Sequence, residues 1–265
     1  MKILFIGDIV GKPGRRAIKE LLPSLVAGHA VDLVIANCEN AAAGFGITRD
    51  IVEELYDAHI DILTSGNHIW DKKEVLEFMG DYETLLRPAN YPGTVPGRGS
   101  VLMPTAAGDY VGVLNLAGRI FMAPIDCPFV AAKNEIARLK TKTNVIIVDI
   151  HAEATSEKKA LGWYLDGEVS AVLGTHTHVQ TADDEVLPGG TAYISDVGMT
   201  GPFDSVIGIK KDTIIERFLT QIPNKFDVAK GDVRLQGVLM DIDAQSGKAN
   251  TIERISVRLN DKTEA

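Results

Sequence analysis

The chain has 265 residues, of which 45% are hydrophobic, and its formal net charge at pH 7 is -9. This length and apolar content are sufficient for one domain with a large core. The negative charge argues against a long nucleic-acid polymer as a partner, because clustered lysine and arginine side chains hold such partners. A small anionic substrate is compatible with the charge, because bound metal ions supply local positive charge.

The two cysteines, Cys38 and Cys127, cannot form a disulfide framework. Lys2 precedes only a short apolar run, so we expect no signal peptide. No apolar run approaches the roughly 20 residues that a membrane-spanning helix needs. These features favour a cytoplasmic protein with no membrane partner, and a homo-oligomer is compatible with them.

The N-terminal half alternates between strand and helix patterns. Apolar runs and helical spacing predict strands at residues 2–6, 31–36 and 60–64, and helices at 15–26, 51–58 and 72–79. Thr48 and Asp71 are the expected caps of the second and third helices. The interval of about 30 residues between strands matches βαβ units and a largely parallel sheet.

Residues 87–130 interrupt this alternation and predict loops and short strands that form a small lid over the site. The segment contains six of the 11 prolines: Pro88, Pro92, Pro96, Pro104, Pro124 and Pro128. Beyond it we expect helices at 130–139, 157–164 (capped by Ser156) and 214–219, strands at 145–150 and 169–173, and an antiparallel pair at 233–242 and 250–258. We expect residues 1–265 to form a single domain with this lid-like excursion.

Side chains that can bind metal ions follow five predicted strands by a few residues each. In open parallel sheets, ligands gather beyond the carboxyl ends of the strands. Any one of these residues alone is weak support, since a lone Asp after a strand is more often a turn residue or a helix cap. Together they predict a two-metal hydrolytic site built from Asp8, Glu39, Asn67, His151 and His176.

His178 follows His176 by two residues, and in extended backbone both rings would face one side. The mixed oxygen and nitrogen ligands, without a thiolate, favour Mn or Fe over a structural Zn site. Two divalent ions held by the carboxylates of Asp8 and Glu39 would leave the site positively charged. Such a site attracts a phosphate oxygen and holds the attacking water in line with phosphorus.

His68 directly follows Asn67, so the two residues are not expected to share a metal ion. An imidazole beside the site can protonate the oxygen that leaves phosphorus. Asp71 could orient this ring. The alternatives are a supporting hydrogen bond for His68 and a plain helix cap for Asp71. Five arginines are candidates to clamp a substrate phosphate or base, although surface roles are also expected: Arg15, Arg16, Arg87, Arg98 and Arg119.

The segments Gly7-Asp8, Gly66-Asn67-His68 and Gly174-Thr175-His176-Thr177-His178 resemble the ordered motifs of the calcineurin-like metallophosphoesterases. Two segments depart from the commonest pattern of that superfamily. Cys38-Glu39-Asn40 stands where a bridging Asp is usual, and Ile69 replaces the acidic residue that usually follows the Asn-His pair. These departures, with residues 8–15 and 122–126, are similar to the bacterial YmdB-like branch over nearly the full length.

The resemblance implies an α/β fold, a four-layer α/β/β/α sandwich with mixed sheets, and a dinuclear Fe or Mn centre. Glu39 would bridge the ions and His68 would be the proton donor. Asp8 and His178 would complete one metal site, with Asn40 near one of the ions, and the other site would use Asn67, His151 and His176. The implied activity is hydrolysis of cyclic nucleotides, of the 2',3'-cyclic nucleotide 2'-phosphodiesterase type.

Two other functions fit the same residues. The first is a phosphomonoesterase, because the metal ions would serve both reactions. The second is a regulatory protein that senses a nucleotide or a metal and turns it over only slightly. The intact set of expected ligands and His68 favours the phosphodiesterase over the sensor.

Overall fold

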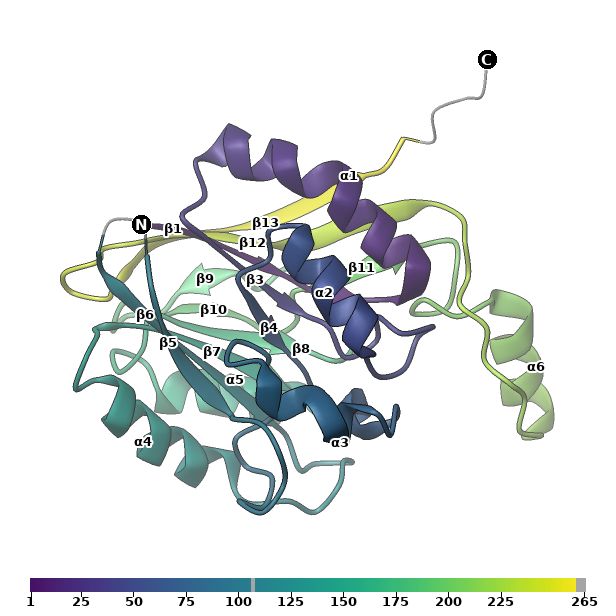
Figure 1. Cartoon of the computed structure of the whole chain (residues 1–265), viewed down its shortest axis with the longest axis horizontal. Coiled ribbons are helices and arrows are strands. Elements are labelled where there is room, and N and C mark those ends of the chain that lie inside the picture. Colours follow the sequence, from purple (N-terminus) through teal and green to yellow (C-terminus); the bar gives the residue numbers. More distant parts are fainter. Residues whose placement is uncertain (106–107, 261–265) are drawn as a thin grey trace.

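A computed structural model describes residues 1–105 and 108–260. Two β-sheets pack face to face, and helices cover both outer faces of this pair (Figure 1). The arrangement is the expected four-layer α/β/β/α sandwich with mixed sheets. Within the described ranges, none of the helices is long and apolar enough to cross a membrane.

The first sheet has seven strands in the order β2-β11-β12-β1-β3-β4, and β13 also pairs with β12. Parallel pairing joins β1 to β3 and β3 to β4, whereas β12 runs antiparallel to β1. The predicted C-terminal antiparallel pair is confirmed as β12 and β13. The strands are β1 (Lys2–Ile6), β2 (Asp8–Ile9), β3 (Leu33–Asn37), β4 (Ile62–Thr64), β11 (Met199–Pro202), β12 (Val233–Ile242) and β13 (Ala249–Arg258).

The second sheet has six strands in the order β5-β6-β7-β8-β10-β9. The inner four are parallel, and the edge strands β5 and β9 are antiparallel to their neighbours. The segment 87–130 contributes β5 and β6 to this sheet, and a lid role for its loops stays a prediction. The strands are β5 (Ser100–Pro104), β6 (Tyr110–Ala117), β7 (Val145–His151), β8 (Ala171–Thr175), β9 (Glu185–Val186) and β10 (Ala192–Ile194).

The central strands are buried on both faces, as expected of parallel strands with covered faces. In β1, Leu4 and Ile6 pack toward the helices α1 (Gly11–His29) and α2 (Arg49–Asp57), whereas Ile3 and Phe5 pack between the sheets. The odd and even residues of β7 divide in the same way between the inter-sheet core and the helices α4 (Pro128–Leu139) and α5 (Thr155–Tyr164). Three apolar layers therefore separate the four layers of secondary structure.

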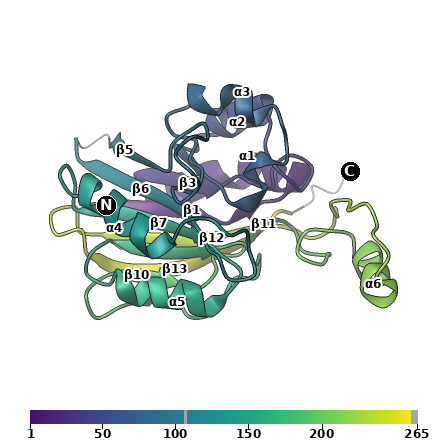
Figure 2. The same ribbon diagram turned by 90° about the horizontal axis from the view of Figure 1, so that it is seen from below.

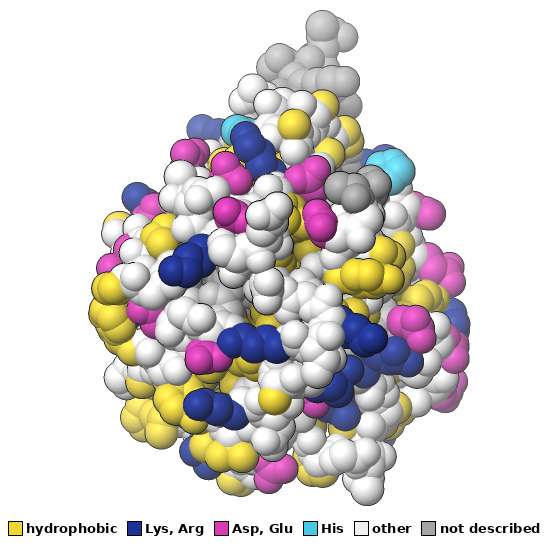
Figure 3. Space-filling model, turned by 90° about the vertical axis from the view of Figure 1, so that its left-hand side faces the viewer, with side chains coloured by type: hydrophobic (Ala, Val, Ile, Leu, Met, Phe, Trp, Pro, Cys, Tyr) yellow, Lys and Arg dark blue, Asp and Glu magenta, His cyan; other side chains and the backbone are white. Residues whose placement is uncertain are grey.

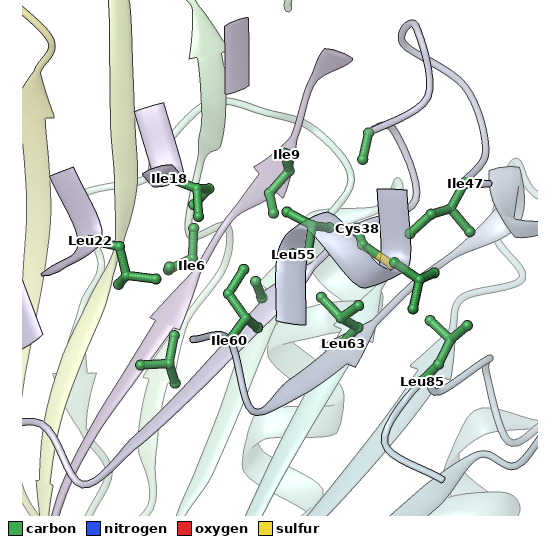
Figure 4. Close-up of a cluster of buried hydrophobic side chains, with 14 of the residues drawn as sticks. Ile6, Ile9, Ile18, Leu22, Cys38, Ile47, Leu55, Ile60, Leu63 and Leu85 are labelled. Atoms are coloured by element: carbon green, nitrogen blue, oxygen red, sulfur yellow. The ribbon is translucent and has the colours of Figure 1, made fainter. Parts of the chain in front are cut away.

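Cys38 belongs to the apolar layer beneath α1 and α2 (Figure 4). Its side chain lies among Ile47, Leu63 and other aliphatic groups. Burial raises the pKa of the thiol above its ordinary value. Cys38 is thus a packing residue, although its neighbour in the chain is Glu39.

Two expected helix starts are wrong. The predicted helix at 72–79 is reduced to α3 (Val75–Phe78), which lies between two 3-10 turns, Asn67–Trp70 and Met79–Asp81. Asp71 does not cap it, because its carboxylate accepts a hydrogen bond from His68 Nδ1 at 2.8 Å. Ser156 does not cap α5, which begins two residues earlier than predicted, with Ala154 as the capping residue.

The last helix, α6 (Lys211–Thr220), lies beside the sandwich and packs over neither sheet (Figure 2). It projects at the end of the molecule opposite the N-terminus (Figure 1). Its inward residue Ile214 is nearly buried, whereas Phe218 and Leu219 are exposed. This helix and the loops that flank it form one wall of the cavity described next.

Candidate metal centre

The inner faces of both sheets change from apolar to polar at the carboxyl ends of their strands. Alternation along β3 places Asn37 on the same face as Ile35, and alternation along β7 places Asp149 and His151 on the same face as Ile147. Asn37 Nδ2 donates a hydrogen bond to Asp149 Oδ2 across the sheets at 3.2 Å. Burial raises the pKa of Asp149 to about 7. The apolar core thus ends in a polar layer at one edge of the sandwich.

His151 lies at the centre of this layer and is fully buried. Its Nε2 atom lies 3.0 Å from Glu39 Oε1, 3.1 Å from Asn67 Oδ1 and 3.0 Å from His176 Nδ1. One ring nitrogen carries a single proton or a single lone pair, so it can satisfy only one of these three atoms. Ligand atoms that share one metal ion at about 2.1 Å would lie roughly 3 Å apart. The cluster therefore has the spacing of a cation site.

A second group of polar atoms surrounds Asp8, which is fully buried. Its Oδ1 lies 3.7 Å from His178 Nε2 and, within the described ranges, has no hydrogen-bond partner. Asn40 Nδ2 lies 3.1 Å from His178 Nε2 and 3.4 Å from Glu39 Oε1. Burial raises the pKa of Asp8, despite the opposing charges of His178 and His151. A buried carboxylate oxygen without a partner is costly, and a cation beside it would remove that cost.

The charges of the centre are strongly coupled. Burial alone would raise the pKa of Glu39, but the charge and the hydrogen bond of His151 outweigh it and lower this pKa to about 2. Burial alone would lower the pKa of His151, but Glu39 and Asp8 raise it to about 9. Burial and repulsion by His151 lower the pKa of His176 to about 3. The directions of these shifts favour a charged Glu39–His151 pair and a neutral His176.

The segment between β8 and β10 turns both of its histidines toward the centre through an unusual backbone. His176 and His178 have φ values of 97° and 64°, so the extended backbone expected from their spacing is wrong. Between them, Thr177 donates to Asp196 Oδ2 from its backbone N at 2.9 Å and from Oγ1 at 2.6 Å. Lys158 Nζ donates to the same oxygen at 3.0 Å. This buried ion pair fixes the turn that aims the two rings.

His68 lies beside the cluster and lines a cavity of about 660 Å³. Its backbone N donates to Glu39 Oε2 at 3.0 Å, and its Nδ1 donates to Asp71 Oδ2 at 2.8 Å. The ring also meets Phe45 edge to face, with centroids 5.0 Å apart. Because Nδ1 is engaged, Nε2 is the nitrogen that remains for a bound molecule.

The rest of the cavity wall is mostly apolar and comes from α6 and the segments on either side of it. Arg217 from α6 is the arginine that lines it, with its guanidinium 4.8 Å from the Phe226 ring centroid. None of the five arginines named from the sequence lines this cavity. Arg15 and Arg98 pair with glutamates, and Arg87 donates to proline carbonyls.

The structure brings all seven expected ligands and His68 to one place. It also adds side chains that the sequence did not indicate. Glu153 Oε2 lies 3.2 Å from His176 Nε2, and the Lys158–Asp196 pair supports Thr177. Glu153 follows His151 by two residues at a strand end, which is the signal that would have found it.

Residues 4–255 match the family model described as YmdB-like protein. The chain belongs to the YmdB-like family. A 2',3'-cyclic-nucleotide 2'-phosphodiesterase from Bacillus subtilis is 52% identical over 257 residues, which cover 97% of each chain. A putative phosphatase/phosphodiesterase from Mycoplasma genitalium is 38% identical and covers 99% of this chain and 95% of its own. The family expected from the motifs is confirmed.

Two crystal structures share the fold of this YmdB-like chain. A hypothetical protein from Thermus thermophilus has a TM-score of 0.91 and 43% identity, and the match covers 97% of this chain and 99% of the other. A novel phosphatase from Mycoplasma pneumoniae has a TM-score of 0.92 and 37% identity, with 99% and 95% covered. The predicted fold class is confirmed.

Proposed function

We propose that this YmdB-like chain is a metal-dependent phosphodiesterase that opens 2',3'-cyclic nucleotides at the bond between phosphorus and O2'. The observation that carries the proposal is the convergence of Glu39, Asn67 and His176 on one nitrogen of His151, directly beside the cavity that His68 lines. The activity itself is suggested by the relative from Bacillus subtilis, whose name states it.

Glu39 would be shared by two metal ions, because its Oε1 contacts both groups of ligands. Asp8, Asn40 and His178 would hold one ion, and Asn67, His151 and His176 would hold the other. Fe or Mn suits this set of carboxylate, amide and imidazole ligands. Bound ions would supply a water of lowered pKa and positive charge beside the phosphate oxygens.

His68 would give its Nε2 proton to O2' as the bond from phosphorus to that oxygen breaks. Asp71 Oδ2 accepts a hydrogen bond from the Nδ1–H of this ring at 2.8 Å, which fixes the direction of Nε2, and Nε2 has a proton to give when the ring is an imidazolium. Phe45 packs against the same ring and limits its rotation. Water supplies the new oxygen on phosphorus, so the product is a nucleoside 3'-phosphate with a free 2'-hydroxyl.

The cavity beside His68 suits a nucleotide. Its volume of about 660 Å³ lies within the range of roughly 300–1,000 Å³ for small-molecule sites. Phe45 and Phe226 offer apolar faces for a base, and Arg217 is placed to meet a polar group of the nucleotide.

The test is hydrolysis of 2',3'-cyclic AMP by Mn-loaded protein, compared with two variants. We expect His68→Ala to retain its metal content and lose roughly a hundredfold or more in kcat, because only proton donation is removed. His151→Ala should lose about one metal equivalent as well as activity. Formation of 2'-AMP, or full activity of His68→Ala, would contradict the proposal.

A phosphomonoesterase is the second candidate, because one similar structure is called a phosphatase. Turnover of bis(p-nitrophenyl) phosphate and p-nitrophenyl phosphate by the same Mn-loaded sample separates the two. A clear preference for the monoester would favour the second candidate. Binding of 2',3'-cyclic AMP with no product from any of the three substrates would favour a sensing role instead.

A further inference from the structure

A second cavity of about 830 Å³ lies next to the one that His68 lines. The two share Phe45 and Phe226, whose rings stack with centroids 6.3 Å apart. The second cavity differs sharply in character from the first. Five cationic side chains and one carboxylate line it: Lys12, Arg16, Lys72, Lys225, Lys230 and Asp227.

Of the five cations in this cavity, Arg16 pairs with Glu20 at 3.6 Å, whereas among the described residues the four lysines are not compensated in this way. The ammonium groups of Lys12, Lys72, Lys225 and Lys230 have no ion-pair or hydrogen-bond partner within the part of the chain that the structure describes. The carboxylate of Asp227 is already paired with Lys210 at 3.1 Å. Like charges gathered in one hollow repel one another, and an anion removes that repulsion.

The rest of the molecule makes this concentration unusual, because the whole chain has a net charge of -9. On the end of the molecule opposite α6, basic, acidic and apolar side chains are interspersed (Figure 3). Helix α1 also begins at the second cavity, and its first turn holds no acidic residue and no side-chain cap. The positive end of this 19-residue helix therefore adds to the charge of the lysines.

The same chain segments position the lysines and the candidate centre. Lys12 follows Asp8 by four residues, and Lys72 follows His68 by four. Gly46 lies against both His68 and Lys72. A Cβ atom added at Gly46 would be 2.8 Å from Lys72 Cγ and 3.4 Å from the carbonyl oxygen of His68. The second cavity and the site where the phosphate ester would bind therefore take residues from the same two chain segments, 8–12 and 68–72.

We propose that the second cavity binds a phosphate group on the 5' side of the nucleoside held in the first cavity. This inference rests on the proposed function and specifies its substrate. Short oligonucleotides that end in a 2',3'-cyclic phosphate are then better substrates than cyclic mononucleotides. The Phe45–Phe226 pair lies where the chain would pass between the cavities, and aromatic faces beside a cationic groove are the usual means of binding single strands.

The size and charge of the two cavities limit the length of this substrate. A cyclic mononucleotide would occupy the first cavity and leave the lysines without an anion. Two or three nucleotides would reach both cavities. A long polymer would extend beyond the second cavity over a protein whose net charge is -9, and would gain little there.

The experiment compares three substrates with the Mn-loaded protein: 2',3'-cyclic AMP, its 5'-phosphorylated form, and the dinucleotide ApA with a 2',3'-cyclic phosphate. We expect kcat/KM to rise about tenfold or more with either added phosphate, mainly through KM, because a charged contact is gained in binding. An equal rise in kcat/KM for the 5'-phosphorylated mononucleotide and the dinucleotide would show that one phosphate on the 5' side accounts for the added binding. A gain only for the dinucleotide would show that the second nucleoside, and not the phosphate, is bound, and would overturn the inference.

The double variant Lys12→Gln/Lys230→Gln should lose most of this gain and keep its turnover of 2',3'-cyclic AMP within about twofold. Lys19→Gln/Lys142→Gln is the matched control, with the same charge change at exposed positions outside both cavities. The gain should also shrink as salt increases in the wild type. A dinucleotide advantage that persists in the first double variant, or that is absent in the wild type, would overturn the inference.

Failure of the proposed function gives a different pattern, in which the wild type hydrolyses none of the three substrates. The second cavity is then tested by binding alone, with the 3'-phosphorylated dinucleotide ApAp and with 3'-AMP. If ApAp binds about tenfold more tightly than 3'-AMP, and Lys12→Gln/Lys230→Gln removes this difference, the result would support phosphate binding in the second cavity. Equal binding of the two ligands would overturn it.

Discussion

Glu39 contacts both groups of proposed ligands, and its position depends on its side-chain length. Glu39 follows β3 by two residues and is fully buried. Its Oε1 faces His151, and its Oε2 accepts a hydrogen bond from the backbone N–H of His68. The superfamily motif that this segment resembles usually has Asp at this place. The additional methylene of Glu39 allows one carboxylate to reach the second sheet while it also fixes the turn that carries His68.

The raised pKa of His151 should make the thermal stability of the metal-free protein depend on pH. The pKa of His151 is about 9 in the folded protein, against an ordinary value of about 6.5. A raised pKa stabilises the folded state fully below pH 6.5, and this stabilisation is lost as the pH rises through 9. We expect the Tm of chelator-treated protein to fall by a few degrees between pH 7 and pH 9.

Thermal unfolding in a pH series measures this effect, with His151→Gln as the control. The variant cannot gain the proton, so its Tm should change less over the same range. A wild-type Tm that is flat or rises from pH 7 to pH 9 would show that His151 is neutral in the metal-free protein. Metal binding should also release a proton near pH 7, since the ligand nitrogen must be free.

At the scale of elements, α5 supports the turn that carries His176 and His178. Lys158 points from α5 to Asp196, and both side chains are nearly inaccessible. Removing one partner of a buried ion pair typically costs about 3–5 kcal/mol, because the other charge is left uncompensated. Lys158→Met should therefore lower the free energy of unfolding by an amount in this range and also weaken metal binding, since Thr177 loses its fixed acceptor.

The adjacent Lys159 offers a matched control for Lys158. It also lies on α5 and pairs with a carboxylate, Glu185 at 2.5 Å, but 36% of its side chain is exposed. Exposed pairs contribute about 0–1 kcal/mol, so Lys159→Met should have little effect on urea unfolding or metal content. Similar decreases in the free energy of unfolding for the two variants would mean that burial does not make the Lys158–Asp196 pair more stabilising than the exposed pair.

The sequence predicted the elements that carry the proposed ligands, but it did not predict the contacts that support those residues. Asp8, Glu39 and His151 follow apolar runs that local patterns reveal, and strands of one sheet share a carboxyl edge. The insertion of β12 beside β1 is different, because that pairing joins residues 2 and 241 and leaves no local pattern. The Lys158–Asp196 pair was missed for the same reason, since its partners are 38 residues apart.

At the scale of the whole molecule, the candidate centre lies between the two sheets, and its proposed ligands come from both. Asp8, Glu39, Asn40 and Asn67 come from the first sheet and the segments that follow its strands. His151 belongs to the second sheet, and His176 and His178 follow β8. Metal ions would therefore join the two halves of the sandwich at the edge where the apolar inter-sheet core ends.

Metal removal should for this reason destabilise the whole fold. An ion present at a hundredfold excess over its Kd stabilises the folded state by about 2.7 kcal/mol. In a protein of this size, that corresponds to a fall in Tm of roughly 5–10 °C on chelation. Hydrogen exchange should increase at the carboxyl ends of β3 and β8 together, because the ions would link both sheets. Asp8→Asn/His151→Gln is the control and should respond little to chelator. An increase confined to one sheet would contradict an ion bridge between them.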